Sequence, residues 1–146
     1  MVTSFKKANG LIVVSRGEGA IVGRFDDFQF DLKTWRIYGY RIKGSGMFAK
    51  AGGVRADLLD MIGRDVAFIA SEEDVEWNGA RQVEDGRAWA SQYRGTRVIG
   101  RNGVNVGVVD DFAFEPGKGV LCLVLDGERM VELDEQVNTG PAAIVL

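Results

Sequence analysis

One stretch of this chain, Val22-Gly23-Arg24-Phe25-Asp26-Asp27-Phe28-Gln29-Phe30, occurs in a second version as Val106-Gly107-Val108-Val109-Asp110-Asp111-Phe112-Ala113-Phe114. At a constant spacing of 84 residues and without a gap, residues of the first copy fall on identical residues of the second. They are Val14, Gly19, Val22, Gly23, Asp26, Asp27, Phe28 and Phe30 on Val98, Gly103, Val106, Gly107, Asp110, Asp111, Phe112 and Phe114. Agreement of this kind predicts an internal duplication. It indicates an architecture rather than a reaction.

The composition is that of a globular protein. The chain has 146 residues, of which 46% are hydrophobic and 27% charged, a balance typical of folded domains. Two units of about 60 to 70 residues would each lie near the lower limit for an independent core, so we expect them to pack against each other or against a second chain. The 20 glycines suit tight turns between short strands.

Charge and rare residue types argue against several classes of function. The net charge of −3 gives no general attraction for nucleic-acid phosphates, so RNA binding would need a local basic patch. The chain has no histidine, which removes histidine-based triads and zinc sites. The single cysteine, Cys122, cannot form an intramolecular disulfide, and no stretch approaches the roughly 20 apolar residues of a membrane span. We therefore expect a cytoplasmic protein without a cofactor or a metal.

Strand-like segments separated by turn residues occur in both copies. Residues 1–10 are expected to form a loose lead-in and residues 57–62 one or two helical turns. Alternation over 104–114 predicts one face made of Val104, Val106, Val108, Phe112 and Phe114. The expected strands are 11–15, 20–30, 34–42, 54–56 and 65–69 in the first copy, and 96–100, 104–114, 120–125, 128–133 and 142–146 in the second. About five short strands with tight turns favour a small twisted barrel in each copy.

The segment between the copies has a different character. Ser71 followed by three acidic residues is typical of a helix start. Trp77 and Trp89 are too large and apolar to be left in water, so we expect them to fix the linker against the barrels. The sequence therefore predicts a first repeat at 11–70, a linker with a short helix at 71–94, and a second repeat at 95–146.

A short strand, a glycine turn, Val-Gly-x-x-Asp-Asp-Phe-x-Phe, an apolar strand and a closing strand together resemble the PRC-barrel family. The family includes a cytoplasmic domain of the photosynthetic reaction centre and the C-terminal domain of a ribosome maturation factor. The resemblance covers about 12–69 and 95–146, and the first copy departs from the pattern in its long loop at 43–53. It implies an all-β protein of two tandem barrels joined by a short linker.

The resemblance implies docking rather than catalysis, because members of this family serve as scaffolding modules in unrelated assemblies. It supplies no catalytic residue. We therefore predict a non-enzymatic protein-interaction module, an adaptor or scaffold for another protein. The first alternative is an RNA- or ribosome-associated factor, and the second is a binder of a small ligand or cation.

The repeated aspartate pairs, Asp26-Asp27 and Asp110-Asp111, are the basis of the second alternative. Adjacent carboxylates suit Mg²⁺ or Ca²⁺. Neighbouring residues of a strand point to opposite faces, however, so a pair cannot chelate one ion without a bulge. Recurrence in both copies favours a structural role, in which one aspartate accepts backbone N–H groups at a bend and the other faces water.

The apolar run 120–125 predicts an interaction surface, because a strand that is apolar on both faces must be covered on both sides. One face fills its own barrel. The other meets the first copy, the linker tryptophans or another subunit. Packing between the copies is favoured, and a homodimer contact is the alternative. Cys122 is expected to be a buried, inert thiol, and the candidate contact residues of the run are Leu121, Leu123 and Leu125.

Two further groups of residues are candidate interaction sites. Met47 and Phe48 form an apolar tip on the glycine-rich loop 43–53, which would either dock a partner or fold over the barrel mouth. An aromatic group next to Arg36 and Arg41 offers stacking platforms for RNA bases, although a half-solvated strand face is the simpler explanation of the same residues. This aromatic group consists of Trp35, Tyr38 and Tyr40.

Overall fold

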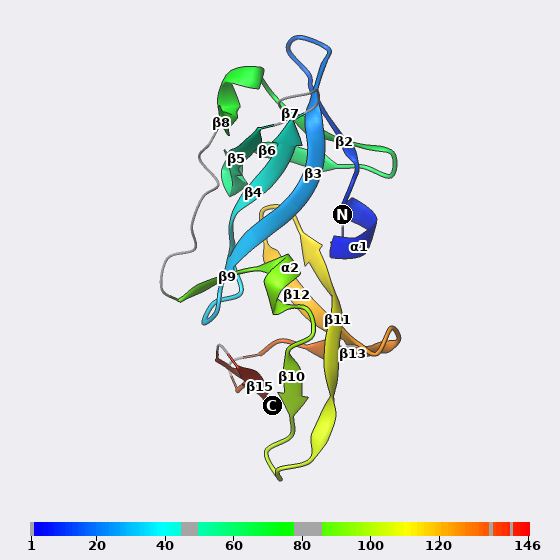
Figure 1. The fold of residues 1–146 in the computed structure, drawn as a ribbon, viewed down its shortest axis with the longest axis vertical. Coiled ribbons are helices and arrows are strands. Elements are labelled where there is room, and N and C mark those ends of the chain that lie inside the picture. Colours follow the sequence, from blue (N-terminus) through cyan, green and yellow to red (C-terminus); the bar gives the residue numbers. More distant parts are fainter. Residues whose placement is uncertain (1, 45–49, 78–85, 135, 141) are drawn as a thin grey trace.

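The computed structural model describes residues 2–44, 50–77, 86–134, 136–140 and 142–146. The chain is mostly β-structure, arranged as two curled sheets that follow one another along the long axis of the molecule (Figure 1). The predicted all-β class is therefore confirmed. The first sheet contains β2 (Ile12–Ser15), β3 (Ala20–Asp31), β4 (Ile37–Gly44), β5 (Ala51–Arg55), β6 (Leu59–Ile62), β7 (Val66–Ile69), β8 (Glu76–Trp77) and β9 (Arg87–Trp89).

The second sheet is formed by the remaining strands, and the helices are all short. Its strands are β1 (Thr3–Ser4), β10 (Arg97–Ile99), β11 (Asn105–Glu115), β12 (Gly119–Leu125), β13 (Arg129–Glu132), β14 (Asn138–Thr139) and β15 (Ala143–Val145). The helices are α1 (Phe5–Ala8), α2 (Ala90–Tyr93), and the 3₁₀ turns η1 (Ala56–Leu58) and η2 (Glu72–Asp74).

The two sheets share one strand order. It is β6-β7-β2-β3-β4-β5 in the first and β14-β15-β10-β11-β12-β13 in the second. In both, the short strand pairs antiparallel with the long strand and parallel with the closing strand. The described residues give the first sheet eight strands and the second seven, more than the roughly five expected. The additional strands are β6, β8 and β9 in the first sheet and β1 and β14 in the second.

The segment that precedes each sheet is paired with the other sheet. β1 lies antiparallel to β11 with Thr3 opposite Phe114, and β9 lies antiparallel to β3 with Ala88 opposite Phe30. The helices α1 and α2 follow these strands at the waist of the molecule (Figure 1). The expectation of a loose lead-in at residues 1–10 is therefore wrong: Phe5 in α1 is only 2% exposed, because it packs into the core shared by the two sheets.

Phenylalanines of the repeated stretch build that shared core. The Phe28 ring lies 4.8 Å from the Phe114 ring and 6.0 Å from the Phe112 ring. Phe30 lies 5.7 Å from Phe112, and Phe5 contacts both Phe28 and Phe112 edge-on. Apart from Phe5 of α1, these side chains come from opposite sheets, and all of them belong to one hydrophobic cluster. The two halves therefore bury each other's aromatic faces, as their small size predicts.

Each aspartate pair lies at a β-bulge. The pairing of β3 with β4 shifts between Phe25 and Asp27, and the pairing of β11 with β12 shifts between Val109 and Asp111. A bulge inserts one residue and reverses the alternation of faces beyond it. The predicted single apolar face of 104–114 is therefore wrong in its first part: Val109 is buried, whereas Val104 and Val108 are exposed.

Several elements differ from the sequence-based expectation in their register or in their type. Val13 pairs with Gly23, and Val98 pairs with Gly107, so Val98 corresponds to Val13 rather than to Val14. The cause is a hairpin turn that is one residue longer in the first half. Residues 57–62 are mainly strand β6 rather than helical turns, because Leu59 and Ile62 face the core. Residues 88–93, which lie in the predicted linker, form the end of β9 and then α2.

Candidate functional site

The buried member of the first aspartate pair holds α2 against the first sheet. Asp27 is fully buried, and its Oδ1 accepts the N–H of Phe28 at 2.8 Å and the N–H of Ser91 at 3.1 Å. The Ser91 hydroxyl donates to Oδ2 of the same carboxylate. The bulge directs this carboxylate to the first turn of α2, where backbone N–H groups lack helical partners.

The second pair repeats the arrangement with α1. Oδ1 of Asp111 accepts the N–H of Phe112 at 2.8 Å and the N–H of Lys6 at 3.1 Å. The ammonium group of Lys6 then lies 2.7 Å from Oδ2 of Asp110. One aspartate of each pair thus accepts backbone N–H groups and the other stays partly solvated, which confirms the structural role expected from the sequence.

Cations neutralise both pairs. Arg41 Nε lies 2.6 Å from Asp26 Oδ2, and its Nη2 lies 3.4 Å from Asp27 Oδ2. Burial raises the pKa of Asp27, although the hydrogen bonds from Ser91 and Phe28 and the charge of Arg41 oppose that rise. The hydrogen bond from Lys6 lowers the pKa of Asp110. The described residues contain no cluster of three or more acidic, cysteine or histidine side chains that could hold a metal ion.

The aromatic group expected to stack on RNA bases is not presented together. Trp35 and Tyr40 are 5% and 1% exposed, because they pack in the core against Phe30 and Phe25. Tyr38 alone of the three is exposed, with the Arg87 guanidinium 3.2 Å above its ring. Two of the three predicted platforms are therefore closed to a nucleic acid.

The other predicted contact residues separate into groups. Met47 and Phe48 lie outside the described residues. Leu123 and Leu125 are fully buried inside the second sheet. Leu121 is 36% exposed, and a register shift between Ala113 and Phe114 leaves it without a pairing partner in β11. The N–H of Val120 donates to the carbonyl of Trp35 at 2.9 Å, so the start of the run does contact the first half.

Trp89 and Trp77, which were expected to fix the linker against the barrels, are buried to different extents. Trp89 is buried and stacks under the Arg41 guanidinium at 4.6 Å. Trp77 lies on β8, whose partner is Gly52 of β5, and keeps 41% of its surface exposed. The linker therefore contacts the first sheet through both tryptophans, but it leaves one of them half in solvent.

Part of the outer face of the second sheet is apolar and open. Cys122 and Val124 alternate with the interior residues of β12, and Val124 pairs with Met130 of β13. Met130 is 63% exposed, whereas Cys122 is buried. Burial, and to a lesser degree the charge of Glu132, raises the pKa of the Cys122 thiol, which agrees with the expected inert thiol. We call this surface the outer patch and define it as Leu121, Cys122, Val124 and Met130.

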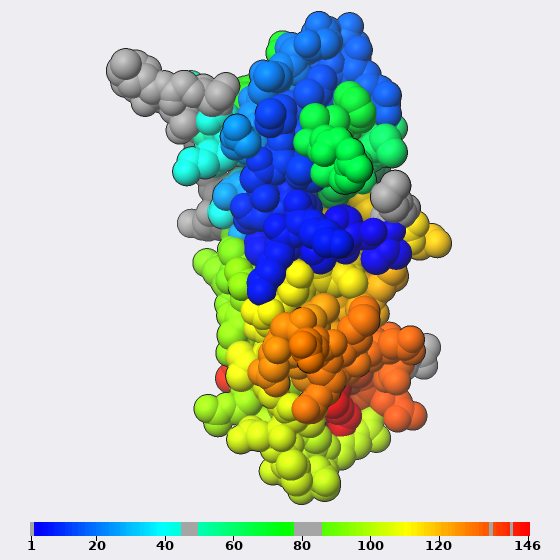
Figure 2. All heavy atoms as spheres, turned by 90° about the vertical axis from the view of Figure 1, so that its right-hand side faces the viewer, coloured from blue at the N-terminus to red at the C-terminus, as the bar shows by residue number. Residues whose placement is uncertain are grey.

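Figure 2 shows the β12–β13 segment in orange at the molecular surface, below the blue N-terminal segment. No element in the described part of the chain pairs with the far edge of β13. Sequence reasoning identified Leu121 but missed Met130, because 128–133 looks like an ordinary solvated strand until its pairing with Val124 is known.

The first sheet has a different surface at the corresponding positions. The pairing of β12 with β11, compared with that of β4 with β3, shows that Cys122 corresponds to Gly39 and Val124 to Arg41. The pairing of β13 with β12, compared with that of β5 with β4, shows that Met130 corresponds to Gly53. A glycine, an arginine and a second glycine thus occupy the places that are apolar in the second half. The strand arrangement itself does not require an apolar outer face.

A cleft lies where the two halves meet beside β4. Its volume is about 620 Å³. Two of its cations are paired with acids, Arg55 with Asp57 and Lys118 with Glu115. Its lining includes Arg36, Ile37, Tyr38, Arg55, Asp57 and Lys118.

No protein-family model matches this chain, and the curated proteins contain no sequence that is significantly similar to it. Among the helices of the described residues, none has the length and apolar character needed to cross a membrane.

Proposed function

We propose that this protein is a non-enzymatic interaction module that docks onto another protein through the outer patch. The observation that supports this most is the contrast between the two sheets. Positions that are apolar on the second sheet are glycine or arginine on the first. An exposed apolar surface that the fold does not need is typical of a binding surface.

The physical properties of the patch suit docking. Met130 projects into solvent with 63% of its surface exposed, and methionine adapts its shape to different apolar partners. Beneath it, Val124 and the buried Cys122 give a rigid floor within the sheet. A flexible apolar side chain on a rigid floor, bordered by polar residues such as Glu132, has the layout of an interface centre with a polar rim.

We also infer that the two halves are copies of one unit of the PRC-barrel type. The support is the common strand order, the bulge at the first aspartate of each pair, and the Val-Gly-x-x-Asp-Asp-Phe-x-Phe stretch. In this view the first copy keeps a polar outer face and the second has become the docking surface. Scaffolding is the role that the family resemblance implies.

A pull-down with matched surface variants tests the proposed function. Tagged wild type, Met130→Glu and Ile21→Glu are incubated with lysate of the protein's own source, and bound proteins are identified and quantified. Ile21 is the control because it is 62% exposed, close to the 63% of Met130, and lies at the far hairpin tip. A charge on the patch should weaken a docked partner by at least about tenfold, and a charge at Ile21 should not.

A stoichiometric partner that wild type and Ile21→Glu retain and Met130→Glu loses supports the proposal. Equal retention by all three proteins overturns it. Sedimentation velocity on the same three proteins decides whether the partner is a second copy. Self-association that only Met130→Glu abolishes would replace the adaptor role with a homodimer contact.

A further inference from the structure

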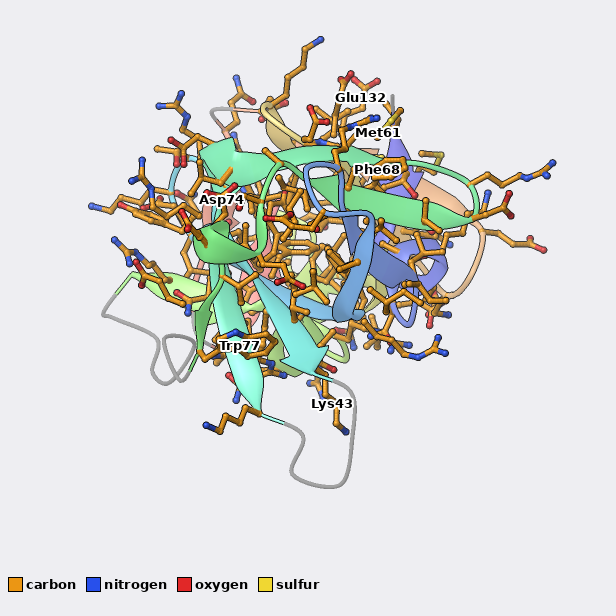
Figure 3. All side chains as sticks on the ribbon, turned by 90° about the horizontal axis from the view of Figure 1, so that it is seen from above. Lys43, Met61, Phe68, Asp74, Trp77 and Glu132 are labelled. Atoms are coloured by element: carbon orange, nitrogen blue, oxygen red, sulfur yellow. The ribbon has the colours of Figure 1, made fainter. Side chains whose placement is uncertain are left out.

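The two sheets differ in how one corresponding edge is covered. On the first sheet, the far edge of β5 carries β8, with Gly52 opposite Trp77 and Gly53 opposite Glu76 in antiparallel register. On the second sheet, β13 occupies the place of β5, and no described segment lies on its far edge. Viewed down the long axis, Trp77 and Glu132 lie on opposite sides of the molecule (Figure 3). The pairing of β8 with β5 in the first half is therefore a model for how the far edge of β13 in the second half would accept a strand.

The backbone of β13 is oriented to accept such a strand. The N–H of Leu133 donates to the carbonyl of Leu121 in β12. Hydrogen-bonding groups of successive residues in an antiparallel strand point to alternate sides, so those of Val131 also face β12. Those of Met130 and Glu132 face the uncovered edge. Met130 corresponds to Gly53, the residue opposite Glu76 in the covered edge of the first sheet.

The side chains along this edge specify the chemistry of the incoming strand. Continuing the β5–β8 register places Asp74 opposite Arg55, and both residues line one hollow of about 170 Å³. Glu132 occupies the place of Arg55 on the second sheet. Arg55 itself pairs with Asp57, and Asp74 accepts the N–H of Ser71. Glu132 is exposed and forms no ion pair with the described residues, so a cation opposite it on an incoming strand would be stabilising.

We propose that the edge of β13 binds an extended segment of a partner protein as an added antiparallel strand. Read from its N-terminus, the segment carries a lysine or arginine opposite Glu132 and, two residues later, an apolar side chain opposite Met130. Backbone hydrogen bonds to an open edge give affinity, and side chains at alternate positions give selectivity. This inference rests on the proposed function, because it states which kind of partner uses the outer patch.

Selection of linear peptides from a random displayed library on the immobilised wild-type protein tests the inference. The enriched peptides are synthesised and their affinities measured for wild type and four variants. Met130→Glu removes the apolar contact and Ile21→Glu is its control. Glu132→Pro removes the outward N–H, which an edge strand tolerates, and Glu132→Gln removes the charge but keeps that N–H. Urea unfolding of each variant confirms that the fold is kept.

The expected peptides contain the cation-x-apolar pattern and bind wild type and Ile21→Glu equally. Glu132→Pro should weaken them about tenfold or more and Glu132→Gln by a smaller factor, because the proline also removes a backbone hydrogen bond. Amide hydrogen exchange of Met130 and Glu132 should slow when the peptide is bound. These results together would establish strand addition.

The outcomes separate this inference from the proposed function. Peptides or pulled-down partners that lose binding to Met130→Glu, but bind Glu132→Pro normally and leave both amides unprotected, overturn strand addition and retain the docking surface. Selection that enriches no peptide also overturns strand addition, while the pull-down still decides the docking surface. Peptides that bind Met130→Glu as well as wild type overturn strand addition beside Met130, and a pulled-down partner that does so overturns the docking surface as well.

Discussion

The backbone N–H of Ser91 donates to Oδ1 of Asp27 across 3.1 Å, joining residues 64 positions apart in the chain. The same bond recurs between Lys6 and Asp111, also at 3.1 Å. In both cases a buried or nearly buried carboxylate of one sheet receives the start of the helix that leads into the other sheet. The aspartate pairs are therefore latches: each holds the helix that leads into one sheet against the other sheet. This structural role explains why the pair occurs in both halves.

Replacing Asp27 by alanine should destabilise the protein by about 2–3 kcal/mol, because the N–H groups of Ser91 and Phe28 lose their acceptor in a buried site. Asp26 is the matched control. Its side chain is 34% exposed and paired with Arg41, so Asp26→Ala should cost less than about 1 kcal/mol. Urea unfolding followed by tryptophan fluorescence measures both. Equal losses would show that the buried carboxylate is not a latch.

The charge of Asp27 should make stability depend on pH. Burial raises its pKa above the unfolded value of 3.8, so the folded state holds this proton to a higher pH than the unfolded state does. The contribution is complete below pH 3.8 and is lost as the pH rises through the folded pKa. Wild type should therefore lose stability relative to Asp27→Asn between pH 4 and neutrality, as measured by urea unfolding at several pH values. The opposite trend would mean that Arg41 and Ser91 outweigh the cost of burial.

Sequence patterns predicted the elements that depend on local chemistry. The long strands at 20–30 and 104–114 and the glycine turns between them occur as expected, because β-branched and aromatic residues between turn residues suit a pleated surface. The capping role of Ser71 was also predictable, since η2 starts there with a capping box. The division of each pair into one aspartate that accepts backbone N–H groups and one that faces water was predicted from the alternation of strand faces together with the repetition.

The exchange of N-terminal segments was not predictable from the same patterns. Nothing local distinguishes Thr3–Ser4, a two-residue strand, from a loose terminus, because its partner Phe114 lies more than a hundred residues away. The bulge at Asp110 was equally hidden. Alternation assigns Val108 to the core, whereas the structure exposes it and buries Val109 instead. Long-range pairing decides such features, and a single sequence does not record it.

Gly119 marks the point where β12 contacts the first half, and its replacement should be costly. It has a φ of +108°, and a Cβ there would lie 2.6 Å from the carbonyl oxygen of Trp35. Gly119→Ala should destabilise the protein by about 2 kcal/mol or more, combining strain with a clash against backbone. Gly117 has a φ of +89° but open space around it, so Gly117→Ala should cost only about 1 kcal/mol. Thermal unfolding of the two variants compares them, and equal shifts would exclude the contact with Trp35 as the cause.

The shared aromatic core predicts that the halves fold only together. A chain divided between residues 80 and 81 gives one fragment with β3 and another with β11. Alone, the first exposes Phe28 and the second exposes Phe112, which pack against each other at 6.0 Å in the intact protein. Each buried phenylalanine contributes about 1.5–3 kcal/mol, so neither fragment should show a cooperative urea transition alone. An equimolar mixture should recover one.

Substitutions in the second fragment of this mixture identify the cause. Phe112→Ala should weaken assembly by about 3–5 kcal/mol, because it removes a fully buried ring. Val104→Ala is the control, since Val104 is 57% exposed at the hairpin tip, and it should leave assembly nearly unchanged. Near-ultraviolet circular dichroism of titrated fragments measures both. If the first fragment alone unfolds cooperatively with the spectrum of the mixture, each half has its own sufficient core. The latches at Asp27 and Asp111 would then only orient two independent units, instead of completing a single one.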